Sequence, residues 1–390
     1  MTDIARQRLR NQYVSRTVLR RPADVVGWFG AMQAQEYEFA KWAIGLRLQD
    51  GSSNAGIGRA FDQGQILRTH VMRPTWHFVT PADIRWLQAL TGPRVQRLAA
   101  PYNQRLALDA RTLTRGIGVI ERALRDRQYL TRIELADRLR QARLPMTGQR
   151  LAQLVMHAET ETVVCSGPRR DRQFTYALVA ERAPGAAVLS RDEALSRLCR
   201  RYFSSHGPAT IRDFVWWSGL TTADAKRGLD ITKARREEID GLDYWTAGSD
   251  RYEETRNDLA YLLPIYDEYL IAYRDRMAVP HGPGVIRPDG RTAVTFQHAV
   301  IVRGQVAGTW KIGRRGHAID VTLTLLRPVT RVESRALDRA VARYERFMET
   351  SVSPSSARIA PATSPASPGP SSSSAGCEAP GTRRRRRESP

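Results

Sequence analysis

The chain has 390 residues, 42% of them hydrophobic, which suffices for two to four domains with buried cores. Its formal net charge is +21 and its isoelectric point is about 10.7, and this excess of positive charge favours a polyanionic partner, most often nucleic acid. The sequence has no run of about 18 apolar residues and no apolar segment near its start, so neither a transmembrane helix nor a signal peptide is expected.

The numbers and spacing of cysteine and histidine restrict the expected cellular compartment and the expected chemistry. The three cysteines are far apart, which fits a reducing, cytoplasmic compartment, and the seven histidines show no zinc spacing. We therefore expect no metal, no cofactor and no membrane contact. Residues 351–390 carry a net charge of +4, which leaves +17 of the +21 on the rest of the chain. A body of this charge is expected to associate with the nucleoid.

Residues 1–95 are predicted to form a winged helix around one short segment. Helical patterns precede and follow this segment, and a glycine ends the first of them. We interpret Met32–Gln35 as the tight turn of a helix-turn-helix, in which Gln33 and Gln35 can share one side. The β-rich stretch 66–79 is predicted to be the hairpin wing.

The same order of patterns recurs twice. Residues 96–188 contain a capping box, Thr131 with Glu134, and two β-rich stretches around a basic turn, 169–172, which is predicted to be a second wing. Residues 189–256 contain two further helical patterns joined by a glycine turn. Because three copies of one unit are a stronger signal than any single copy, we predict three tandem winged-helix units.

The pattern changes near residue 257, where a small β domain is predicted over residues 257–348. Arg303-Gly304 separates two β-rich stretches and favours a hairpin turn, and a closing helix is predicted over residues 333–347. Residues 349–390 are rich in Ser, Pro and Ala, contain an arginine run and are predicted to be disordered. The predicted fold class is therefore α+β: three tandem winged-helix units, a small C-terminal β domain and a disordered tail.

Several motifs occur in an order typical of one known family. They are Met32-Gln33-Ala34-Gln35, Arg68-Thr69 with Met72-Arg73-Pro74-Thr75-Trp76-His77, Ser205-His206-Gly207-Pro208-Ala209-Thr210 with Trp216-Trp217, Leu262-Leu263-Pro264 with Asp267 and Tyr269, and Val306-Ala307-Gly308-Thr309-Trp310. On these motifs, over residues 5–347, the chain resembles the AlkZ/YcaQ-type winged-helix DNA glycosylases, in their Gln-x-Gln branch. The resemblance implies excision of alkylated purines from double-stranded DNA, including the unhooking of interstrand crosslinks. It also implies that Gln33 and Gln35 are catalytic.

A carboxamide pair suits one class of substrate. A purine alkylated at N7 or N3 is cationic and leaves easily, so the site needs only to place a water molecule and to stabilise a positive sugar. An amide carbonyl does both weakly, but it cannot act as a general base as a carboxylate can. From spacing alone, the commoner interpretation is that Gln33 and Gln35 satisfy the backbone of a turn. With the resemblance, hydrolysis of the N-glycosidic bond by a monofunctional glycosylase is the predicted function.

Other acidic residues have competing interpretations. Glu36 and Glu38 are nearby carboxylates, but they are expected to charge the first turn of a helix rather than to act as bases. The acidic residues within 267–275 are expected to form ion pairs with Arg274 and Arg276. Neither group is therefore assigned to the catalytic site.

Candidate DNA-binding side chains are expected in the hairpins, where they could meet phosphate or sugar. They are Arg68, Arg73, Thr75, His77, Arg169, Arg170, Arg172 and Arg303. For the histidine of the first hairpin, a surface position without a role is an equally good interpretation. Trp216 and Trp217 are expected in the core rather than as base-stacking platforms.

Two other functions use the same architecture. A non-catalytic winged-helix regulator would read a DNA sequence with one helix and would pair through a dimer element. The chain has three units and no heptad pattern, so we expect a monomer and favour the glycosylase. A scaffold that holds other repair proteins through its tail is the third interpretation.

Overall fold

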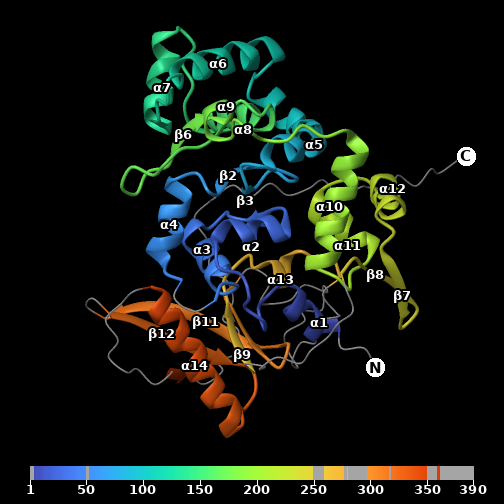
Figure 1. Cartoon of the computed structure of the whole chain (residues 1–390). Coiled ribbons are helices and arrows are strands. Elements are labelled where there is room, and N and C mark those ends of the chain that lie inside the picture. Colours follow the sequence, from blue (N-terminus) through green and yellow to red (C-terminus); the bar gives the residue numbers. More distant parts are fainter. Residues whose placement is uncertain are drawn as a thin grey trace, which may run out of the picture.

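The computed structural model describes residues 4–49, 52–248, 259–275, 279, 297–315, 318–348 and 358–360. Figure 1 shows three helical units and a sheet domain, coloured from blue at the N-terminal end to red at the C-terminal helix. Among the described residues, no helix is both long and apolar enough to cross a bilayer. The mixed α+β class is confirmed.

The first unit follows the short helix α1 (Ile4–Asn11) and has the order helix, strand, helix, helix, strand, strand. Its elements are α2 (Pro22–Phe29), β1 (Met32–Gln33), α3 (Tyr37–Gly45), α4 (Asn54–Asp62), β2 (Leu67–His70) and β3 (Trp76–Val79). The strand that comes last in the sequence lies in the middle of the sheet, in the order β1-β3-β2. Both neighbouring pairs are antiparallel.

The second unit repeats this order after the long helix α5 (Ile84–Arg105). Its elements are α6 (Ala110–Ala123), β4 (Leu130–Thr131), α7 (Arg132–Gln141), α8 (Gly148–Thr160), β5 (Val164–Ser166) and β6 (Thr175–Leu178), followed by the single turn α9 (Val179–Arg182). The strand order is β4-β6-β5, which matches that of the first unit. The predicted capping box of Thr131 and Glu134 is present at the start of α7.

The third unit also has three helices followed by a β-hairpin. Its elements are α10 (Arg191–Ser205), α11 (Ile211–Ser218), α12 (Thr222–Thr232), β7 (Arg235–Ile239) and β8 (Leu242–Thr246). A single bridge between Ala209 and Trp245 takes the place of the first strand. Ser190, Thr210 and Thr221 begin its three helices with capping boxes. Local polar side chains therefore fix where each helix begins.

The C-terminal domain is a five-stranded sheet covered by one helix. Its elements are β9 (Ala260–Leu263), the single turn α13 (Glu268–Ile271), β10 (Ala299–Val302), β11 (Gln305–Arg315), β12 (Ala318–Leu325), α14 (Arg331–Phe347) and β13 (Arg358–Ala360). The strand order is β13-β12-β11-β10-β9. The predicted hairpin turn is confirmed, with φ of 52° at Arg303 and 80° at Gly304. The closing helix is also confirmed.

The predicted helix-turn-helix turn is wrong in one respect. Met32–Gln33 is a strand, and the helix pair of the first unit is α3 and α4, whose connection begins at Leu46. Helix α4 was missed because its sequence is glycine-rich, although Ser53 caps it by accepting a hydrogen bond from Gly56 N.

The predicted disorder of residues 349–390 is not met at residues 358–360, which form β13 parallel to β12; the remainder of that stretch lies outside the described residues.

One hydrophobic core joins the first unit to the C-terminal domain. Trp42 of α3 packs against Tyr344 of α14 with ring centroids 5.0 Å apart, and its indole N–H donates to Leu262 O at 2.7 Å. A buried ion pair, Arg47 with Asp267, crosses the same interface at 2.8 Å. The first unit and the sheet are therefore one packed body.

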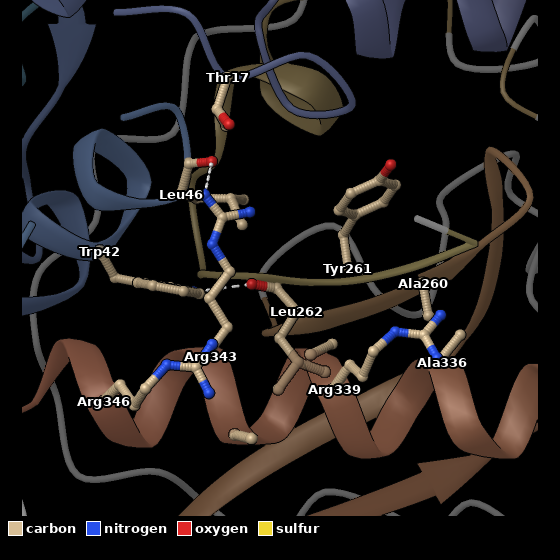
Figure 2. Close-up of a pocket in the computed structure, with 12 residues that line it drawn as sticks. Thr17, Trp42, Leu46, Ala260, Tyr261, Leu262, Ala336, Arg339, Arg343 and Arg346 are labelled. Atoms are coloured by element: carbon tan, nitrogen blue, oxygen red, sulfur yellow. Dashed lines mark hydrogen bonds between the residues drawn. The ribbon is translucent and has the colours of Figure 1, made fainter. Parts of the chain in front are cut away.

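A cavity of about 340 Å³ lies between α3, β9 and α14. Figure 2 shows three arginines of α14, Arg339, Arg343 and Arg346, on one side of it. Arg343 reaches across and donates to Leu46 O at 2.9 Å, beside the end of α3. None of the predicted site residues lines this cavity, so the candidate site lies elsewhere.

Candidate active site

Gln33 lies in strand β1 beside the first hairpin, and Gln35 lies in the bend that follows this strand. Gln33 pairs with His77 of β3, and Ala34 N donates to Trp76 O at 2.7 Å. That Gln33 and Gln35 face the same side stays a prediction, because Gln35 lies beyond the end of the strand. Both side chains are half-buried, so each retains some exposed surface.

Neighbouring donors set the orientation of both carboxamides. Arg73 Nη2 lies 3.2 Å from Gln33 Oε1, and the backbone N of Trp76 lies 3.4 Å from Gln35 Oε1. A guanidinium and a backbone N–H can only donate, so the oxygen of each amide must face them. Each carbonyl oxygen keeps a second lone pair that can accept from water.

His77 supports Arg73 from inside the hairpin. Its Nδ1 lies 2.9 Å from Thr75 O, which fixes the proton on Nδ1, and its Nε2 lies 3.4 Å from Arg73 Nη2 and accepts from it. Burial, and secondarily the charge of Arg73, lower the pKa of His77 to about 3. His77 is fully buried and neutral, so it holds Arg73 and does not face DNA directly.

A buried carboxylate lies directly behind Gln33. Glu268 Oε1 accepts from Gln33 N at 2.8 Å, and its Oε2 accepts from Trp217 Nε1 at 2.9 Å and from His206 Nε2 at 3.3 Å. Burial alone would raise the pKa of Glu268, but the hydrogen bond and charge interaction with His206, the hydrogen bond from Gln33 N and the charge of Arg73 lower it to about 2. Burial lowers the pKa of His206, and its contact with Glu268 opposes that shift. Glu268 is therefore a fixed negative charge.

Arg68 holds the glutamine segment from its other side. Its Nε donates to Ala34 O at 2.9 Å and its Nη2 donates to Gln35 O at 3.3 Å. The guanidinium carbon lies 4.3 Å from the ring centre of Trp76 and 4.5 Å from that of Phe174, which belongs to the second unit. With 7% exposure, Arg68 positions the backbone, and the geometry does not favour its predicted contact with DNA.

The other predicted DNA-binding residues lie in several places. Arg169 pairs with Glu38 at 3.0 Å, and Arg170 pairs with Glu134 at 2.7 Å. Arg172 is exposed at the tip of the same turn. Arg303 lies in the C-terminal sheet, where it pairs with Glu333. Thr75 lies next to the glutamines on the first hairpin and is half-buried. Their contact with DNA stays a prediction.

Two residues of the site were missed by sequence reasoning. The acidic residues at 267–275 were expected to pair with Arg274 and Arg276, but Asp267 pairs with Arg47, and Glu268 binds the glutamine strand; Arg276 lies outside the described residues. The expectation is therefore wrong for both carboxylates. No local signal identified Glu268, because its partners come from other units.

Trp216 is the second residue that was missed. It was expected in the core with Trp217, which is fully buried, yet Trp216 is 42% exposed. Its Nε1 donates to Ile271 O at 3.0 Å, and its backbone O lies 3.5 Å from Arg73 Nη1. One guanidinium thus contacts both Trp216 and Gln33.

Among the residues that the structure describes, no three His, Cys, Asp or Glu side chains group as metal ligands. The arrangement offers two oriented carbonyl oxygens, one fixed carboxylate and one guanidinium. Such a set can place water and stabilise a positive charge.

A strongly basic chain with this polar, non-titrating site defines a candidate enzyme of the DNA glycosylase class. The chain belongs to the AlkZ-like DNA glycosylase family, because the family model "DNA glycosylase AlkZ-like" matches residues 26–347. The resemblance seen in the sequence is thereby confirmed.

Two comparisons with a single relative agree. The chain is 25% identical over 336 residues to the interstrand DNA cross-link repair glycosylase of Streptomyces sahachiroi, covering 78% of this chain and 86% of the relative. The solved structure of DNA glycosylase AlkZ from that organism has the same fold, with a TM-score of 0.71 and 19% identity over 92% of this chain and 98% of that chain.

Proposed function

We propose that the protein is a monofunctional DNA glycosylase that hydrolyses the N-glycosidic bond of cationic alkylated purines, N7 or N3 adducts, in double-stranded DNA. Family membership supports the glycosylase class. The observation that carries the substrate class is the pair of oriented carboxamides, Gln33 and Gln35, whose carbonyl oxygens face Arg73 and the backbone N of Trp76. Because the name of the relative is that of a crosslink repair glycosylase, crosslink unhooking is part of the proposal.

In the proposed reaction, water attacks the anomeric carbon while the N-glycosidic bond breaks. The electron pair of that bond goes to the purine nitrogen and neutralises the positive charge of the adduct, so no acid is needed. The carbonyl oxygens of Gln33 and Gln35 accept from the water and direct it. The water oxygen gains positive charge as it bonds, and its proton leaves to solvent. The products are a free alkylated base and an abasic site.

We propose that the three repeated units are winged helices that together bind duplex DNA. The observed order of helices and strands is the one a winged helix needs, and the net charge of +21 complements phosphate. Arg169, Arg170, Arg172 and Arg303 are the proposed phosphate contacts, and Arg73 reaches the lesion. We further propose that the protein acts as a monomer in the cytoplasm, on the nucleoid.

The activity is tested with duplex DNA that contains N7-methylguanine. The expected result is release of free base and an abasic site that alkali cleaves, with no release from the same duplex carrying unmodified guanine. A crosslinked duplex tests unhooking separately. If the protein binds duplex DNA but releases neither adduct, the regulator interpretation replaces this proposal.

The excision rate is expected to be independent of pH between about 5 and 8. Gln33 and Gln35 do not titrate, Glu268 is ionised above its pKa of about 2, and His77 is neutral above its pKa of about 3. Lowering the pH to 5 therefore protonates none of these groups. Single-turnover rate constants measure this, and an inflection near pH 6.5 would reveal a histidine base that the site does not contain.

Trp216→Ala is expected to weaken binding of lesion-containing duplex by about tenfold, because loss of one aromatic–base stack costs about 1–3 kcal/mol. Trp216 is 42% exposed, its backbone O lies 3.5 Å from Arg73 Nη1, and the hydrogen bond from its indole to Ile271 O holds the ring in place. Trp216→Phe keeps a ring and should bind within about twofold of the parent. Fluorescence anisotropy with labelled duplex measures both, and equal affinity of the parent and the Ala variant would remove Trp216 from the DNA surface.

A further inference from the structure

Without Glu268, the charges around Gln33 would destabilise the positively charged sugar that forms in the reaction. The nearest cation is Arg73, whose Nη2 lies 3.2 Å from Gln33 Oε1. A guanidinium at this distance draws electron density from the amide and repels a cation that forms beyond it. Glutamine side chains carry no net charge, so they cannot offset the repulsion from Arg73. If Arg73 were the one charge near the glutamine strand, the oxocarbenium ion would be destabilised.

Glu268 binds the backbone of the same strand and carries the opposite charge. It is buried and accepts from Gln33 N at 2.8 Å, and among the described residues its other donors are Trp217 and His206. In a dry environment a charge acts over a longer distance than in water, because less solvent screens it. The negative potential of the carboxylate therefore extends past the strand backbone to the region around the Gln33 side chain.

Three separate parts of the chain hold this carboxylate in place. Trp217 comes from α11, His206 from the end of α10, and Gln33 from β1. The ring of His206 is itself stacked on Tyr202, with centroids 4.6 Å apart and an angle of 16°. Because every donor sits on a packed element, the charge is oriented before any DNA binds, which is what electrostatic catalysis requires.

We infer that Glu268 is a positioning residue of the site, which sets the strand that carries Gln33 and offsets Arg73 so that a positive sugar is stabilised. This inference rests on the proposed function and adds a role that the carboxamides cannot fill. The carboxylate touches no substrate in this arrangement, since Gln33 lies between them. It acts through the backbone N–H of Gln33 and through its charge.

The test compares Glu268→Gln with Asp83→Asn as the matched control. Asp83 is also a buried carboxylate that accepts a tryptophan N–H, that of Trp86 at 2.9 Å, and it pairs with Arg201. Glu268→Gln is expected to lower the single-turnover excision rate constant by about 100-fold at saturating enzyme, the size of one preorganised electrostatic contact. Asp83→Asn is expected to change that rate by less than about threefold, although both variants lose a buried hydrogen-bonded charge.

A binding measurement separates charge from a purely structural effect. Duplex DNA with a pyrrolidine abasic analogue carries a protonated ring nitrogen, whereas a tetrahydrofuran analogue is neutral. The parent should prefer the pyrrolidine duplex, and Glu268→Gln should reduce this preference about tenfold while tetrahydrofuran affinity holds. Glu268→Asp keeps the charge and should retain the preference even if its melting temperature falls.

The outcomes distinguish the inference from the function. If the parent releases no adduct from any lesion, the proposed function fails, and the analogue preference still decides whether Glu268 favours a cation. If the parent is active but Glu268→Gln matches Asp83→Asn in rate and in analogue preference, the inference is wrong and Glu268 is only a structural carboxylate.

Discussion

Replacing Gln33 and Gln35 together by alanine is expected to lower the single-turnover excision rate constant for N7-methylguanine by at least about 1000-fold. The two carbonyl oxygens are the acceptors that the hairpin donors Arg73 and Trp76 turn into a fixed orientation. Without them, water near the sugar is unordered and the developing cation loses both dipoles. Affinity for the lesion duplex should remain within about threefold, because phosphate contacts dominate binding.

A second glutamine pair in the same unit provides the control. Gln63 and Gln65 are also two residues apart, are exposed, and form a hydrogen bond with each other at 2.9 Å at the end of α4. Their double alanine variant removes the same atoms and should excise within about twofold of the parent. If Gln33→Ala/Gln35→Ala keeps more than about a tenth of the parental rate, the catalytic assignment fails.

The single variants are informative in the same series. Gln33 contacts Arg73 through its side chain and Glu268 through its backbone N, while the side chain of Gln35 accepts from the backbone N of Trp76. Residues that act as a unit show non-additive losses, so each single variant should lose most of what the double variant loses. Independent, multiplicative losses would indicate that the two carbonyls do not direct one water molecule.

Much of the repeated architecture could be predicted because its signals are local. Capping boxes such as Thr131 with Glu134 lie within four residues of each other, and amphipathic helices show their period in any short window. The turn at Arg303-Gly304 was likewise predicted from its own residues. These elements need no distant partner to be recognised.

That part of the glutamine segment is a strand could not be predicted from local signals. Met32–Gln33 is only two residues long and becomes a strand through pairing with Phe78 and His77, which lie more than forty residues later. Nothing in the segment itself distinguishes a strand from a turn. Helix α4 was hidden for another reason, since Gly56 and Gly58 lower its intrinsic helix propensity.

The carboxylate of the site was missed because its partners lie far away in the sequence. Glu268 binds Gln33 across 235 residues of sequence, and its neighbour Asp267 binds Arg47 across 220. Nearby arginines made a local ion pair the simplest expectation. Burial decided otherwise, because a buried carboxylate must be fully hydrogen-bonded, and only donors from other units were available.

Loss of either partner of the buried Arg47–Asp267 ion pair should therefore destabilise the fold strongly. Both side chains are fully buried. Arg47 Nη1 donates to Asp267 Oδ2 and Arg47 Nη2 donates to Asp267 Oδ1, each at 2.8 Å. The remaining N–H groups of Arg47 donate to Ala43 O and to the backbone and side-chain oxygens of Gln12. Removing one partner leaves the other charged and buried, which costs about 3–5 kcal/mol.

Asp267→Asn is accordingly expected to lower the free energy of unfolding by about 3–5 kcal/mol. Urea titration followed by tryptophan fluorescence measures this, since Trp42 and Trp310 lie in the same core cluster. The control is Asp137→Asn in the exposed pair of Asp137 with Arg140, which should cost less than about 1 kcal/mol.

A double-mutant cycle decides whether the cost comes from the pair. Arg47→Met alone leaves Asp267 charged and buried without its partner, whereas Arg47→Met/Asp267→Asn leaves no unpaired charge. The free energy of unfolding lost in the double variant should therefore be smaller than the sum of the two single losses by at least about 2 kcal/mol. Additive losses would mean that packing around Arg47, not its charge, joins α3 to α13. In that case the hydrogen bonds from Gln33, Trp217 and His206 would hold Glu268, one residue beyond Asp267, without a contribution from the ion pair.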